Sequence, residues 1–168
     1  VRRVLNREPN NVAALNTRGL INYVQKEYNL AEWVFKEKVL RIDKSSTEAW
    51  TNLGLTYLAI DEKPSAVLSF QRAIQLDPEN IAARLNLAAI YLDYLDYTRA
   101  QEMYQNVLER QPDHIEAHIG LGTAMRGIGE LEVTIKHYER VLELSKRHNK
   151  LLFRLGDIYE NMAKNDEA

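Results

Sequence analysis

Apolar residues recur along this chain at the spacing of a helix face. Trp50, Leu53 and Tyr57 are three and four residues apart, and a second run follows with Ala66 and Phe70. Side chains three or four positions apart lie on the same face of an α-helix. Polar or proline-containing turns separate the runs. The pattern therefore predicts pairs of helices, each of about four turns.

The helix pair recurs with a period of 34 residues. Leucine stands at Leu53, Leu87, Leu121 and Leu155, and the next residue is glycine or alanine each time. A small residue lets two helices approach closely while a larger side chain fills the space beside it, which gives dense packing. A fixed period of this length is typical of stacked repeats.

Proline marks the ends of two units, at Pro78 and Pro112. A residue before proline is pushed out of the helical region, and proline is tolerated where the next helix starts. This register predicts the end of a preceding repeat, four full repeats and one further first helix, at residues 1–11, 12–46, 47–80, 81–114, 115–148 and 149–168.

The unit 47–80 closely resembles the tetratricopeptide repeat (TPR) motif, through Trp50, Leu53, Gly54, Tyr57, Ala66, Phe70, Ala73 and Pro78. The resemblance covers essentially the whole chain as a single array. It implies an all-α fold, a right-handed superhelical solenoid of antiparallel helix pairs. Because the array begins and ends within a repeat, we expect a fragment of a longer protein, whose uncapped ends leave self-association open.

The unit 12–46 fits this motif least well. Its later apolar positions stay in register only if one residue has been inserted after Phe35, which gives this unit 35 residues. Arg18 and Asn22 stand where the family favours an apolar residue. We interpret Trp33 as a core residue, because large exposed aromatic side chains are uncommon without a partner.

Composition excludes several classes of function. A net charge of −2 and a pI near 6.1 provide no field for attracting nucleic acid. No apolar stretch is long enough to insert into a membrane, and without cysteine there are no disulfides and no thiolate metal sites. We expect a water-soluble chain, in the cytoplasm or a bacterial periplasm; the sequence does not distinguish these compartments.

No set of residues has the spacing of a catalytic or phosphate-binding motif, so we expect neither enzymatic activity nor a cofactor. His114 and His118 are four residues apart and resemble a metal pair, but His118 replaces Trp50 in the repeat. We therefore interpret His118 as a partly buried structural histidine and expect no metal site.

In the TPR family, first helices line the concave side and hold a partner peptide or helix. Projected onto this chain, the expected partner-binding residues are Asn52, Leu55, Leu58, Leu85, Asn86, Leu92, Ile119, Lys150, Phe153 and Arg154. The leucines could instead pack between repeats. Asn52 and Asn86 are 34 residues apart, where some family members use asparagines to bond a peptide backbone.

Lys150 and Arg154 match the last two cations of the family's carboxylate clamp, but Leu85, Ala89 and Gly120 occupy its other places, so the clamp is broken. The sequence thus predicts a non-catalytic scaffold that binds a protein or peptide with apolar anchors. The alternatives are a substrate-delivery module of a larger enzyme, such as a glycosyltransferase, and a cochaperone of secretion or pilus assembly.

Overall fold

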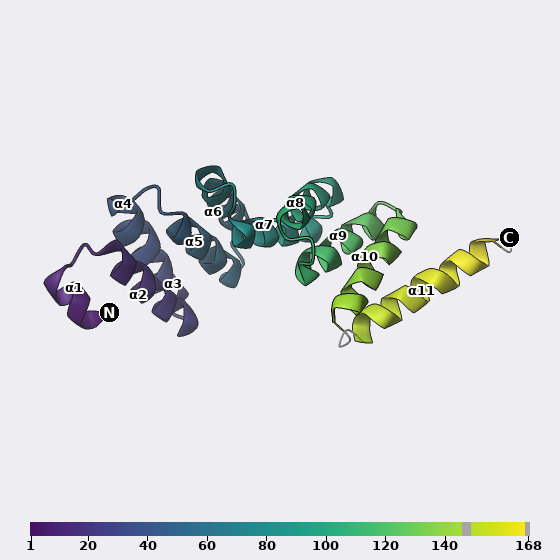
Figure 1. The fold of residues 1–168 in the computed structure, drawn as a ribbon. Coiled ribbons are helices and arrows are strands. Elements are labelled where there is room, and N and C mark those ends of the chain that lie inside the picture. The colour runs from purple at the N-terminus through teal and green to yellow at the C-terminus, as the bar shows by residue number, and fades with distance from the viewer. Residues whose placement is uncertain (146–148, 167–168) are drawn as a thin grey trace. The chain divides into compact units, whose positions relative to one another are not determined.

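The computed structural model describes residues 1–145 and 149–166, and these residues form helices joined by short turns (Figure 1). The predicted all-α architecture is confirmed. In chain order the helices are α1 (Arg2–Arg7), α2 (Val12–Val24), α3 (Tyr28–Trp33), the π-helix η1 (Val34–Val39), α4 (Leu40–Ile42), α5 (Thr47–Ala59), α6 (Lys63–Leu76), α7 (Ile81–Asp93), α8 (Tyr97–Arg110), α9 (Ile115–Gly127), α10 (Leu131–Leu144) and α11 (Asn149–Asp166).

The chain divides into two units, Val1–Leu87 and Ala88–Ala168, each with its own apolar core. In the first unit the central cluster is formed by Leu15, Ala31, Phe35, Val39, Leu40, Ala49 and Leu53. In the second it is formed by Ile135, Tyr138, Val141, Leu151, Leu155 and Ile158. Both clusters collect the apolar positions that the repeat predicts.

The small residue after each repeated leucine allows a ring from the paired helix to lie against the backbone. A Cβ atom added to Gly54 on α5 would be 2.6 Å from the ring of Phe70 on α6. A Cβ atom on Gly122 of α9 would likewise be 2.5 Å from the ring of Tyr138 on α10. Any larger residue at either glycine would push the two helices apart, because neither distance leaves room for a methyl group.

The first helix of each pair begins at a residue whose side chain caps its first turn. Asn11, Ser46 and Asn80 accept a hydrogen bond from the backbone N–H three residues later, at 2.9, 3.3 and 2.9 Å. His114 occupies the same place before α9, and its Nδ1 accepts from the N–H of Ala117 at 3.2 Å. These bonds satisfy backbone donors that a helix N-terminus otherwise leaves unpaired.

The π-helix η1 lies where the sequence predicts an inserted residue. It covers Val34–Val39 and continues α3 into the short helix α4. A π-helical turn has hydrogen bonds from residue i to i+5 and so takes up one residue more than an α-helical turn. Phe35 and Val39 both remain buried. The extra residue is therefore accommodated inside the second helix of this pair, without exposing its core face.

Candidate functional site

The predicted surface on the first helices is partly formed in the first unit. Asn52, Leu55 and Leu58 on α5 are all half-buried, so each still presents part of its side chain to solvent. Leu20 and Val24 on α2 are exposed. Within the described residues, the side-chain amide of Asn52 has no hydrogen-bond partner. The helices α2 and α5 are in contact. We call these five residues the first-helix surface.

The predicted residues on α7 differ in their surroundings. Leu85 is only 8% exposed, which corrects its expected place on a binding surface: its side chain belongs to the core. Asn86 is half-buried, and its Nδ2 donates to the carbonyl of Ala82 at 2.8 Å, one turn earlier in the same helix. Its Oδ1 is left to accept a bond. Leu92, in the second unit, is half-buried.

The remaining predicted residues lie in the second unit. Ile119 on α9 is half-buried and packs against that unit's apolar cluster. Lys150, Phe153 and Arg154 on α11 are exposed, and Phe153 is 77% exposed. An exposed phenylalanine beside two cations is unusual for a monomeric surface, so this turn of α11 keeps the apolar and cationic character that the sequence predicts for it.

Two features of the unit 12–46 differ from expectation or extend it. Trp33 is 44% exposed, with the ammonium of Lys38 lying 4.6 Å from its ring centroid, so the interpretation of Trp33 as a core residue is wrong. The cation covers one face of the ring and accounts for part of its tolerance of solvent. Arg18 and Asn22 line an open pocket of about 640 Å³ beside α1.

The histidines form a contact that the sequence does not reveal. His118 is buried, as predicted, and its Nε2 lies 2.8 Å from the carbonyl oxygen of Pro112 while its Nδ1 lies 2.9 Å from Nδ1 of His137. A carbonyl only accepts, so His118 donates from Nε2; with both rings neutral, His137 then donates to Nδ1 of His118. Burial, and then the charge of His118, lower the pKa of His137.

These contacts define structural roles for His114 and His118. His114 caps α9, and His118 joins α9 to α10 and to the preceding turn. Among residues 1–145 and 149–166, no group of three histidine, cysteine or acidic side chains is arranged to hold a metal ion. In the same described part of the chain, no helix is long and apolar enough to cross a membrane.

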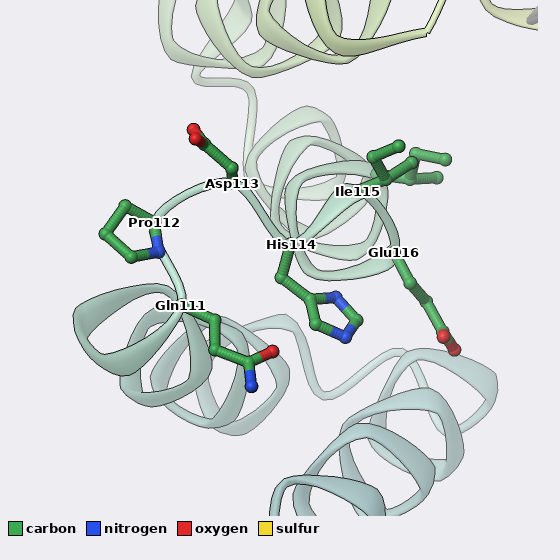
Figure 2. A pocket seen from close by; sticks show the side chains of 7 residues that line it. Gln111, Pro112, Asp113, His114, Ile115 and Glu116 are labelled. Carbon is green, nitrogen blue, oxygen red and sulfur yellow. The ribbon is translucent and has the colours of Figure 1, made fainter.

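An open pocket of about 830 Å³ lies at the turn between α8 and α9. Figure 2 shows Gln111, Pro112, Asp113 and His114 following one another around this turn, with Ile115 and Glu116 in the first turn of α9. Its polar groups already have partners: His114 caps the helix, and Asp113 accepts from Nη2 of Arg140 at 2.6 Å. The pocket therefore offers a ligand little that is not already bonded.

A more apolar pocket, of about 430 Å³, lies in the first unit on the side of the second helices. Sequence reasoning missed it. We call it the Trp50 pocket; its lining residues are Lys36, Trp50, Leu53, Tyr57, Ser65, Leu68, Ser69 and Arg72. The signal in the sequence is Ser69, a small residue at the position that His137 occupies two 34-residue periods later.

The aromatic walls of the Trp50 pocket are held in place by hydrogen bonds. Nε1 of Trp50 donates to the carbonyl of Lys44 at 3.0 Å, and the hydroxyl of Tyr57 donates to Oε1 of Glu32 at 3.0 Å. Burial and the Glu32 carboxylate raise the pKa of Tyr57 to about 12, so its phenol remains a donor. Both rings are thereby fixed with their apolar parts along the pocket.

Helix pairs with capped first helices, a small residue after each repeated leucine and short turns define the TPR class of helical-repeat protein. Residues 37–151 match the cytochrome c-type biogenesis protein H TPR domain. The chain belongs to this TPR family. No curated protein matches the chain by sequence.

Solved structures give the same assignment. The crystal structure of MamA is 30% identical, with a TM-score of 0.77 over 89% of this chain and 86% of MamA. MamA 41-end from Desulfovibrio magneticus RS-1 is 21% identical, with a TM-score of 0.82 over 92% and 86%. YrrB, described as a TPR protein with an unusual peptide-binding site, is 17% identical, with a TM-score of 0.84 over 96% and 83%. The last two support the fold alone.

Proposed function

We propose that this chain is a non-catalytic scaffold whose first-helix surface holds an apolar segment of a partner protein. The observation that carries the proposal is the exposed apolar strip formed by Leu20 and Val24 on α2 beside the half-buried Leu55 and Leu58 on α5. Leu20 and Leu55 occupy the same place in successive repeats. Apolar strips along neighbouring helices are the surfaces that bind amphipathic helices or extended segments.

Asn52 gives the strip its polar contact. Its amide has no partner among the described residues, and it can donate to and accept from a peptide backbone at the same time. Asn86, in the same unit, keeps an acceptor oxygen after donating to Ala82. An apolar partner segment would therefore have its side chains on the leucines and its backbone bonded by these amides.

The family match makes proteins of cytochrome c-type biogenesis the first partners to test. YrrB is described as binding a peptide, and the same kind of ligand suits the proposed surface here. Purified candidate partners are titrated against the chain by calorimetry. Binding with a negative heat-capacity change marks apolar burial, whereas heat that depends only on ionic strength would point to surface charge instead.

Matched leucine variants test the surface itself. Leu20 on α2 and Leu30 on α3 are 40% and 39% exposed, but only Leu20 belongs to the first-helix surface. With a partner in hand, Leu20→Asp is expected to weaken binding about tenfold or more, since it places a charge in an apolar contact. Leu30→Asp is expected to leave affinity unchanged. Equal effects of the two variants would reject the proposed surface.

The asparagine is tested separately. Asn52→Ala is expected to weaken binding about five- to hundredfold, because a backbone group of the partner is left buried without its bond. Thr17→Ala on α2 is the control, since Thr17 is exposed and bonds within its own helix to Ala13. Full affinity in Asn52→Ala would show that the segment is held without this amide.

A further inference from the structure

We propose that the Trp50 pocket is a second binding site, which takes an aromatic side chain of a partner flanked by carboxylates. This site goes beyond the proposed function, because it lies on another face of α5. Successive residues of an α-helix are rotated by about 100°. Trp50, Leu53 and Tyr57 therefore share one face, while Asn52 and Leu55 lie on nearly the opposite one.

The preference for an aromatic ring follows from the same place in the second unit. There His118 replaces Trp50 and His137 replaces Ser69, two periods along the chain. The two imidazole rings lie with centroids 5.1 Å apart, so the chain fills that space with a ring of its own. Ser69 cannot do this; its hydroxyl donates to the carbonyl of Ser65 at 2.8 Å. The Trp50 pocket is thus the space that a ring occupies elsewhere.

The carboxylates are inferred from an arginine that lacks them. Arg140 in the second unit donates to Asp113 at 2.6 Å and to Glu143 at 2.7 Å. Arg72 stands at the equivalent position beside the Trp50 pocket, where Ser45 and Gln75 replace those two acids. Its one bond among the described residues is to the neutral amide of Gln75. A partner carboxylate would supply the missing partner of Arg72.

Lys36 adds a second cation to the rim. Its ammonium lies 3.7 Å from Glu32, whose carboxylate also accepts from Tyr57. The lining thus carries two cations, Lys36 and Arg72, against the single neighbouring acid Glu32. Lys36 belongs to η1, and π-helical turns recur at functional sites. An aromatic residue between acidic neighbours matches both the apolar floor and the cationic rim.

The test uses the fluorescence of Trp50. Trp33 and Trp50 are the two tryptophans of the chain, so Trp33→Phe leaves Trp50 as the reporter. The probe is a capped pentapeptide with a central phenylalanine and two glutamates on each side. We expect a saturable change in Trp50 emission. A peptide with central alanine is expected to bind at least about tenfold more weakly, and one with lysine flanks to show no saturable change.

Two variants locate the site, and one separates it from the first-helix surface. Ser69→His places a ring where His137 lies in the second unit and is expected to abolish the signal. Arg72→Gln removes the cation from a half-buried position, so the fold is retained; it is expected to weaken binding about two- to fivefold and to reduce its salt dependence. Asn52→Ala, which disables the proposed backbone contact, is expected to leave this titration unchanged.

Three results would overturn the proposal. The first is equal binding of the phenylalanine and alanine peptides. The second is an unchanged titration in Arg72→Gln with its salt dependence intact. The third is a dimer, seen by sedimentation without peptide, that Ser69→His converts to monomer, since the pocket would then hold a second copy of the chain. Failure of the first-helix variants would leave all three readouts unaffected.

Discussion

The Trp50 pocket and the His118–His137 contact are the same place in two repeats, built once open and once closed. In the first unit Trp50 faces Ser69, and a pocket of about 430 Å³ remains. In the second, His118 and His137 are 2.9 Å apart between ring nitrogens. The backbone frame is shared, as Gly54 and Gly122 both lie against a ring. Side-chain substitution on a constant helix pair therefore decides whether the place is a cavity or a contact.

The largest effects should come from breaking the shared frame. Leu53 and Leu121 are equivalent, and each is 2% exposed. Leu53→Ala and Leu121→Ala should each lower the free energy of unfolding by about 2–5 kcal/mol, because a cavity replaces the lost side chain. Urea denaturation measures both. A loss in one variant alone would mean that the two places do not rest on equivalent packing.

Opening the closed place should have an intermediate effect. His137→Ser recreates the residue found at Ser69 and removes the bond to His118, whose Nδ1 is then buried without its donor. We expect a loss of about 1–3 kcal/mol, measured by urea denaturation. Ser69→Ala in the first unit is the control, since the Ser69 hydroxyl bonds only within its own helix. A larger loss in Ser69→Ala would contradict the comparison.

Acidification should weaken the closed place and leave the open one unaffected. The pKa of His137 is lowered from 6.5 by burial and by His118, so the folded chain binds fewer protons than the unfolded chain near that pH. Stability gained above pH 6.5 is therefore lost as the pH falls through 6.5 toward the lowered value. The melting temperature is expected to decrease over that range, and to decrease less in His137→Gln. Identical pH profiles would assign the effect elsewhere.

The smallest effect is expected at the arginines. Arg140 makes exposed ion pairs with Asp113 and Glu143, which water and salt screen. Arg140→Gln, which copies the neutral surroundings of Arg72, should change the denaturation midpoint only slightly, and less at high salt than at low salt. A shift as large as that of His137→Ser would mean that charge rather than ring contact closes this place.

The ladder of residues around Leu53 and Gly54 predicts the helix pairs and their close approach, because both depend on spacing along the chain. Even the extra residue after Phe35 is visible, since it displaces the apolar positions behind it. The His118–His137 contact was missed because the residues are 19 apart in sequence and on different helices. Comparing each residue with its equivalents in other repeats, Ser69 with His137, is the step that exposes it.

Burial was less predictable than helix position. Leu85 was expected on a surface and is in the core, whereas Trp33 was expected in the core and is exposed. Spacing places both residues on helices but leaves their orientation ambiguous. Near Trp33 the π-helical turn that follows changes the rotation per residue. What covers Leu85 depends on side chains distant in sequence, which one repeat cannot reveal.

The π-helical turn also separates the length of a repeat from its geometry. An added residue in a loop usually leaves the helices untouched, whereas here the addition lies inside a helix and the buried face survives it. A chain of this kind can gain or lose single residues within its helices as it diverges, while its interfaces continue to mate. Neighbouring repeats of 34 and 35 residues are thus structural equals, and the one with the surplus residue carries a mark of its own history.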